Sequence, residues 1–170
     1  MAAGATYEPI ATQTLGSAAA TVTFSSISGS YTDLVLIVNG GMSSGAAYVS
    51  MQLNGDTTMT NYSVTYLRGD GSTAASGRYS GASGRYNVSG LPITTTALTA
   101  NIIFQFQNYS NSTTYKTVLN RFNDTVVGTS VGVALWRNTN AITQIVLREA
   151  DSGANWLTGT TFTLYGIAAA

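Results

Sequence analysis

Residues 46–54, AAYVSMQLN, alternate apolar and polar side chains, so that Val49, Met51 and Leu53 share one face and the polar residues between them share the other. A period of two is typical of a half-buried β-strand, because successive side chains of a strand point to opposite faces. The alternation recurs along the chain in segments rich in Thr, Val, Ile and Tyr. No stretch of helical length places apolar residues three and four positions apart. The sequence therefore predicts an all-β protein with minimal helix.

Turn residues such as Asn39-Gly40-Gly41 divide the chain into short strand-like segments at regular intervals, which indicates a sandwich or a barrel. Residues 34–38 are apolar on both faces and predict a central strand. The expected architecture is an antiparallel β-sandwich, with a jelly roll as first choice and an immunoglobulin-like sandwich as the alternative. Eight or nine strands are expected, at residues 21–24, 33–38, 46–54, 62–66, 102–107, 115–122, 131–136, 142–147 and 161–167.

The domain organisation follows from length and from the N-terminal composition. A chain of 170 residues predicts one domain that buries roughly two-thirds of its unfolded surface. Residues 1–20 are expected to form an extended arm, and residues 21–170 a single β-sandwich domain. The N-terminus has no basic, apolar leader pattern, and the longest apolar run is far shorter than a bilayer span. Synthesis in a cytoplasm is therefore expected.

Composition argues against an enzyme. The chain has no His and no Cys, 14 charged residues among 170, and 44 Ser and Thr residues. Without His and Cys it lacks the commonest general base, the commonest metal ligand and the thiolate metal ligand. Seven basic residues balance seven acidic ones, so neither nucleic acid nor an anionic membrane is an expected partner. No cofactor, metal site or catalytic residue is predicted.

The scarcity of charge bears on assembly. Free sheet edges are usually protected by charged residues, especially Lys, and Lys116 is the only lysine. The edges are therefore either covered or paired with other subunits, and the expected state is a permanent homo-oligomer. The alternative is a monomer that Ser, Thr and Asn keep soluble.

The clearest candidate for a partner-binding site is residues 68–90, where Ser-Gly-Arg-Tyr occurs twice, seven residues apart. Its Tyr, Ser, Gly and Arg content resembles that of adaptable binding loops. Tyr provides a large contact area, and Arg provides a rigid set of donors. The predicted partner-binding residues are Arg78, Tyr79, Arg85 and Tyr86. The alternative is a mobile surface loop in which the repeat has no function.

Other candidates have simpler interpretations. Glu149 and Asp151 would share a strand face roughly 7 Å apart, as glycoside hydrolysis could use, but a solvated rim at a strand end is favoured. Trp136 and Trp156 could stack on sugars, although packing in the core or at a subunit interface is favoured. Arg68-Gly69-Asp70 spells an integrin-type tripeptide, yet Gly and Asp are ordinary turn residues.

Several segments resemble a known class of proteins: residues 10–15 (IATQTL), 29–36 (GSYTDLVL), 108–110 (NYS), 115–117 (YKT) and 161–167 (TFTLYGI). They resemble small virion structural proteins of tailed bacteriophages, particularly those that infect cyanobacteria. The resemblance implies a β-sandwich displayed on a virus particle, either as a capsid cement protein or as the head domain of a fibre. It carries over no functional residue.

Two functions follow from this resemblance. The first is a capsid cement or decoration protein, located in the virion, that binds the major capsid protein as an oligomer and stabilises the shell. A trimer is the expected oligomer for this function. The second is a tail-fibre or receptor-binding module that recognises a host surface polysaccharide. A glycosidase or lyase would depend on Glu149, Asp151 and scattered tyrosines, and ranks last.

Overall fold

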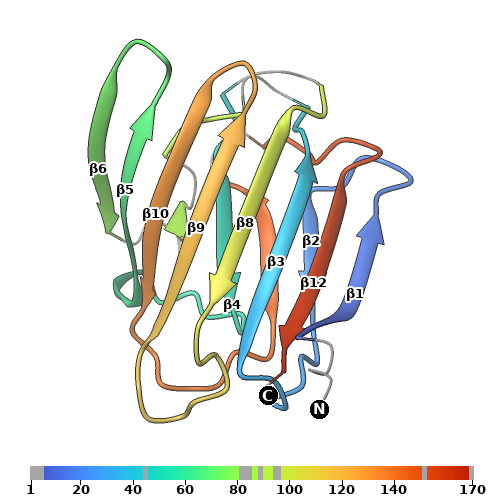
Figure 1. Cartoon of the computed structure of the whole chain (residues 1–170), viewed down its shortest axis with the longest axis vertical. Helices are drawn as coiled ribbons and strands as arrows, with labels where there is room; N and C mark the ends of the chain where they lie inside the picture. The colour runs from blue at the N-terminus through green and yellow to red at the C-terminus, as the bar shows by residue number, and fades with distance from the viewer. Residues whose placement is uncertain are drawn as a thin grey trace.

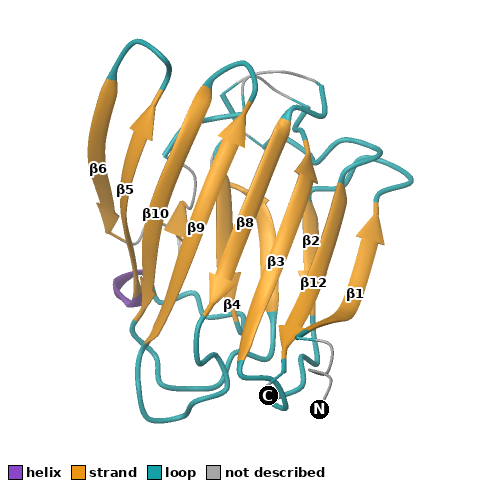
Figure 2. Cartoon of the chain, in the orientation of Figure 1, coloured by secondary structure: helices purple, strands orange, loops and turns teal. Residues whose placement is uncertain are grey.

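The alternation of apolar and polar residues in the sequence corresponds to alternating burial of side chains in the observed strands. In β8 (Ala100–Phe106) and β12 (Thr161–Ile167) every second side chain is buried. The computed structural model describes residues 6–43, 46–80, 86–87, 90–93, 97–150 and 153–168. Within them, twelve strands build two antiparallel sheets, and the helical content is one 3-10 turn at Met59–Asn61. The predicted antiparallel β-sandwich is confirmed (Figures 1 and 2).

The two sheets differ in width, and the larger one lies in front in Figure 1. In spatial order its strands are β1 (Tyr7–Thr14), β12, β3 (Asp33–Gly40), β8, β9 (Lys116–Asp124), β10 (Gly128–Trp136), β5 (Tyr62–Gly69) and β6 (Ala74–Ser80). The smaller sheet contains β2 (Thr21–Phe24), β11 (Ile145–Glu149), β4 (Val49–Leu53) and β7 (Tyr86–Asn87).

The core lies between the sheets. Leu34, Leu36 and Val38 of β3 are buried on its inner face, and Val35 of the opposite face is also nearly buried. β3 pairs with β12 on one side and β8 on the other, so the predicted central strand is confirmed. Burial of many aliphatic and aromatic side chains between two sheets is the main source of stability in such a fold.

The strand arrangement corrects the sequence-based expectation in detail. A jelly roll has eight strands in two sheets, whereas here one sheet alone contains eight, so the jelly roll is not confirmed. The described residues form more than the eight or nine strands expected. The additional ones are β1, β6 and β7.

These strands lie in segments that were expected to be an arm or a loop, and β7 falls in the same expected loop as β6. β1 lies within the expected arm of residues 1–20, but it pairs with β12 from Tyr7 to Thr14, with a register shift near Pro9. This segment is therefore an edge strand and not a free arm. β6 lies within the expected loop of residues 68–90 and pairs with β5 across a tight turn. Pairing with the neighbouring strand outweighs the weak strand propensity of Ala, Gly and Ser.

Candidate functional site

The outer face of the large sheet, which is turned away from the small sheet, carries side chains in rows that cross the strands. Because paired residues of neighbouring strands point to the same face, the register defines each row. One row contains Ile37, Ile103, Arg121, Val131 and Leu67. The next row contains Val35, Gln105, Leu119, Val133 and Thr65.

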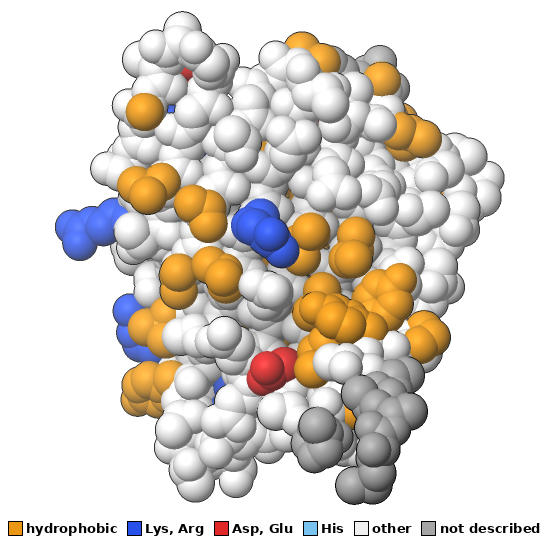
Figure 3. Space-filling model, viewed as in Figure 1, with side chains coloured by type: hydrophobic (Ala, Val, Ile, Leu, Met, Phe, Trp, Pro, Cys, Tyr) orange, Lys and Arg blue, Asp and Glu red, His pale blue; other side chains and the backbone are white. Residues whose placement is uncertain are grey.

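These rows create an apolar surface, here called the outer-face patch, which consists of Ile37, Ile103, Leu119, Val131, Val133 and Leu67. Three of its members are strongly exposed: Leu67 at 60%, Val133 at 49% and Val131 at 39%. Figure 3 shows apolar side chains gathered across this face with few charged ones between them. Contiguous exposed apolar surface is typical of an interaction site.

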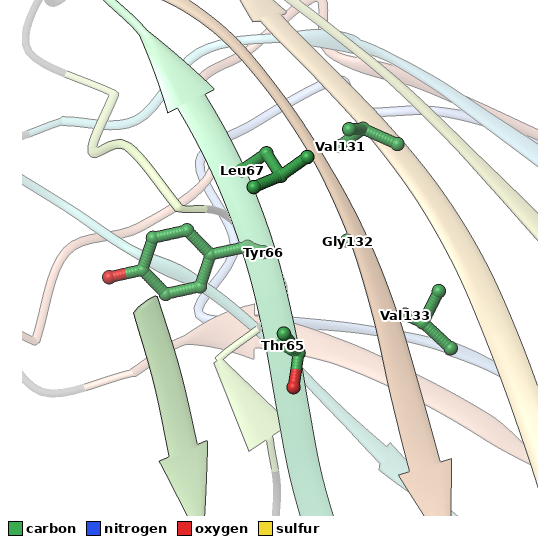
Figure 4. Close-up of a pocket in the computed structure, with 6 residues that line it drawn as sticks. All are labelled: Thr65, Tyr66, Leu67, Val131, Gly132 and Val133. Atoms are coloured by element: carbon green, nitrogen blue, oxygen red, sulfur yellow. The ribbon is translucent and has the colours of Figure 1, made fainter. Parts of the chain in front are cut away.

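A shallow groove lies within the patch, between β5 and β10. Thr65, Leu67, Val131, Gly132 and Val133 line it, and its volume is about 220 Å³. In Figure 4 the side chains of Leu67, Val131 and Val133 border the groove, while Tyr66 points away from them.

Gly132 lies beneath this groove, and a side chain at this position would point to the inner face of the sheet, toward Asn120. A Cβ at Gly132 would lie 2.6 Å from Asn120 Oδ1, closer than atoms can approach without a shift. The floor of the groove is the sheet backbone, and its walls are the outward-pointing side chains, most of them aliphatic. Such a surface can bind an apolar side chain of a partner, but it offers no group that could act in acid–base chemistry.

A second, polar groove of about 420 Å³ lies beside the first, at the end of β5 and β6. Arg137 is held there by two hydrogen bonds: Nη1 donates to Thr60 O at 3.2 Å and Nη2 donates to Ser63 Oγ at 3.0 Å. The exposed Arg78 lines the opposite side. The described lining consists of two arginines and several hydroxyl side chains and contains no carboxylate, so it favours a carboxylate or another oxygen-rich ligand. Its described lining residues are Ser63, Val64, Thr65, Arg78, Tyr79, Ser80 and Arg137.

The structure separates the residues predicted from the repeat. Arg78 and Tyr79 are neighbours in β6 and point to opposite faces, with Arg78 opposite Thr65 and Tyr79 opposite Val64. Tyr86 belongs to β7 in the other sheet, and its side chain lies outside the described residues. Arg85 lies outside them as well. The two copies of the motif therefore do not form one repeated strand.

Tyr79 has a clear structural role. Its ring stacks on Tyr66, with centroids 5.5 Å apart and an interplanar angle of 25°. A hydrogen bond with Tyr66 and burial together raise the pKa of Tyr79 to about 12. Gly77 and Gly90 provide the space for the Tyr66 ring, since a Cβ at either would lie within 2.6 Å of a Tyr66 atom.

We expect Gly77→Ala to destabilise the protein by about 2 kcal/mol, because the added methyl group would overlap the Tyr66 hydroxyl group and disturb its stacking on Tyr79. Urea denaturation measures the loss, and near-UV circular dichroism reports the tyrosine pair. Gly16→Ala is the control, because no atom lies within 4 Å of the added Cβ. Equal stability of the two variants would contradict this packing.

The predicted carboxylate pair is only partly described, because Asp151 lies outside the described residues. Glu149 is buried, and its Oε2 accepts a hydrogen bond from Gly153 N at 2.8 Å. The expectation of a solvated rim is therefore wrong for Glu149. Among the residues that the structure describes, no group of three or more His, Cys, Asp or Glu could hold a metal ion.

Asp70 of the Arg-Gly-Asp tripeptide closes the turn between β5 and β6. Its Oδ1 accepts hydrogen bonds from Ser72 N at 2.9 Å and Thr73 N at 2.7 Å. These bonds hold the pKa of Asp70 well below its usual range. The carboxylate thus has local donors within the turn, as the turn interpretation predicts.

Both tryptophans are buried in the core, which confirms the packing interpretation over sugar stacking. Trp136 Nε1 donates to Asp56 Oδ2 at 2.7 Å, and Trp156 packs edge-on against Phe162 at a centroid distance of 5.0 Å.

Lys116 is also buried. Its Nζ donates to Thr114 O at 2.7 Å and Thr139 O at 2.9 Å, and burial lowers its pKa. The only lysine therefore does not protect a sheet edge.

Sequence reasoning did not identify the outer-face patch or Arg137. The alternation in β10 placed Val131 and Val133 on the face opposite Ala134 and Trp136, but it did not show which face is covered by the second sheet. The β5–β10 register supplies that information by bringing Leu67 opposite Val131.

No helix in the described part of the chain is both long and apolar enough to span a membrane.

Fold and surface together define an all-β sandwich with a broad, charge-poor outer face. No protein-family profile matches the chain, and no curated protein matches it. Among solved structures it is similar to galectin LEC-6 of Caenorhabditis elegans, with 8% identity over 89% of this chain and 94% of that chain and a TM-score of 0.35. A mutant of alginate lyase Aly36B in complex with an alginate tetrasaccharide has 11% identity, coverage of 93% and 79%, and a TM-score of 0.33. Likenesses this distant carry no inference about function.

Proposed function

We propose that the protein is a structural component of a tailed-bacteriophage virion, a decoration protein that binds the major capsid protein as a homo-oligomer. The proposal combines the sequence resemblance with one structural observation, the exposed outer-face patch. Leu67, Val131 and Val133 stand exposed side by side on a regular sheet. A rigid apolar surface of this kind suits a permanent contact with another protein.

The proposed attachment depends on the area of apolar surface that is buried when the protein contacts the shell. Zero formal charge leaves little long-range repulsion between copies or against a shell. Each apolar side chain that becomes buried contributes about 1.5–3 kcal/mol. An oligomer binds through several copies of the same weak contact at once, and this avidity makes its attachment more stable than that of a single copy. The proposed activity involves no reaction, cofactor or metal ion.

A second function, recognition of a host polysaccharide by a fibre head, is favoured by one observation, the polar groove. Arg78, Arg137 and the hydroxyl groups beside them could bind carboxylate and hydroxyl oxygens of an acidic glycan. Exposed Trp and Tyr were the side chains expected to stack on sugars, and the buried positions of Trp136 and Trp156 remove the tryptophans from that set.

Occupancy on purified particles tests the proposal. We expect quantitative mass spectrometry and antibody labelling of virions to find this chain in many copies distributed over the capsid. We expect no signal from an array of acidic polysaccharides. Labelling confined to the tail, with array binding that Arg78→Ala and Arg137→Ala abolish, would instead support the fibre function. Absence of the chain from purified virions would contradict both.

A further inference from the structure

β6 ends the large sheet as an open edge, visible at the left of Figure 1. Six of its seven residues are exposed, and no described strand pairs with its outer side. It contains no Pro, no acidic residue and no register shift. Regular, weakly charged edges of this kind are templates for pairing with another strand.

The other edges are protected or short. β1, at the opposite side of the sheet, contains Glu8 and Pro9, and its register shifts between Pro9 and Ala11. Each of these features hinders the addition of a strand. In the small sheet, β2 has four residues and β7 has two. Among the described edges, β6 is therefore the one that combines length with regularity.

The turn between β5 and β6 determines which backbone groups of β6 face outward. Asp70 N donates to Thr73 O at 3.2 Å, which makes this pair a hydrogen-bonded one. Hydrogen-bonded and non-bonded pairs alternate along an antiparallel ladder, and the register continues without interruption to Ser63 and Ser80. The residues that present their N–H and C=O groups to the open side are therefore Ala74, Ser76, Arg78 and Ser80.

We propose that β6 pairs antiparallel with β6 of a second copy of this chain, about a two-fold axis at Gly77. In this register Ser76 lies opposite the partner's Arg78, and Ala74 lies opposite the partner's Ser80. All four outward residues then have hydrogen-bonding partners. Shifting the strands by two residues in one direction leaves Ser80 without a partner. The opposite shift leaves Ala74 without one and places the two Arg78 side chains directly opposite each other, which is repulsive.

The geometry of the pair connects it to the proposed function. Antiparallel edge pairing about such an axis continues the sheet into the second copy and keeps both outer faces on the same side. The two outer-face patches would then form one doubled surface that a shell could contact, with a gain in avidity. The inference rests on the proposed function only because both require the chain to form an oligomer. It favours a two-fold dimer over the expected trimer.

Charge placed at Ser76 tests the register, because the two-fold axis brings each new charge opposite an arginine of the partner. Ser76→Lys creates two repulsive pairs, and we expect it to weaken the dimer about tenfold. Ser76→Glu creates two attractive pairs and is expected to strengthen the dimer about tenfold at low salt. Ser25→Lys and Ser25→Glu, at an exposed position after β2, are controls with the same net charge and should leave the dimer unchanged.

Sedimentation equilibrium of the full chain measures the dissociation constant, and far-UV circular dichroism checks the fold. Ser76→Pro removes an outward N–H and should give a folded monomer. A wild-type chain that is monomeric or trimeric would overturn the inference, as would equal effects of lysine and glutamate at position 76. Binding to shells is measured separately. If the wild-type chain forms the dimer but does not bind shells, that result contradicts the proposed function and does not contradict the β6 pairing.

Discussion

Replacing Asp56 by alanine is expected to lower the free energy of unfolding by about 3 kcal/mol. The carboxylate connects the loop after β4 with Trp136 of β10, eighty positions away in the sequence. Its Oδ2 accepts from Trp136 Nε1 and from Asn61 Nδ2, each at 2.7 Å, and its Oδ1 accepts from Thr58 N at 2.8 Å. Alanine at this position would leave the indole N–H of a fully buried tryptophan without an acceptor. An unsatisfied buried donor costs about 1–3 kcal/mol, and loss of the other two bonds adds to it.

Asp70→Ala provides the matched control for this variant. Asp70 accepts a comparable set of hydrogen bonds, but from the residues of an exposed turn, where water can replace it. We expect Asp70→Ala to cost less than about 1 kcal/mol. Urea denaturation followed by tryptophan fluorescence measures both variants. Similar losses at the two positions would contradict the role assigned to burial of Trp136.

The same carboxylate predicts an acid-sensitive component of stability. Burial raises the pKa of Asp56, but the hydrogen bonds from Asn61, Thr58 and Trp136 outweigh it, and the pKa falls from its ordinary value of 3.8 to about 2. The folded protein therefore binds this proton less readily than the unfolded chain does. The contribution of Asp56 is fully present above about pH 4 and is lost as the pH falls toward 2. Asp56→Asn should make the free energy of unfolding less dependent on pH between about 4 and 2.

Combining Leu67→Glu with Val133→Glu is expected to weaken attachment to the capsid by on the order of a hundredfold. Both side chains are exposed members of the outer-face patch, in neighbouring strands. A carboxylate buried there would have to lose its water. Arg121 and Arg78 are the basic residues in these rows, and neither lies directly opposite position 67 or position 133. The fold should be unaffected, because neither side chain enters the core.

Val126→Glu is the matched control for the patch. Val126 is 63% exposed and lies in the turn between β9 and β10, outside the patch. Binding of purified variants to particles that lack the protein, followed by sedimentation, measures attachment. Full occupancy by the double variant would show that the outer face is not the contact surface.

The sequence predicted those parts of the fold that depend on alternation alone. Strands rich in Val, Ile, Phe and Thr, such as β8 and β12, were placed close to their observed bounds. β6 was not recognised, because Ala74–Ser80 has weak strand propensity and becomes a strand through pairing with β5. β1 was interpreted as an arm for a similar reason. Its partner, β12, lies at the other end of the chain.

The candidate site was predictable only in part. Composition drew attention to Arg78 and Tyr79, and the structure places Arg78 in the polar groove and Tyr79 on a tyrosine partner. The outer-face patch depends on register across several strands, and no single segment contains that information. The role of Asp56 was not predictable, since nothing in the sequence connects it to Trp136, eighty positions away.

A cryo-electron microscopy reconstruction of the virion tests the central claim most directly. The account predicts density for this sandwich on the capsid surface, with the outer-face patch in contact with the major capsid protein and the small sheet turned away from it. Density for the sandwich with that face open to solvent, or located only on the tail, would contradict the account.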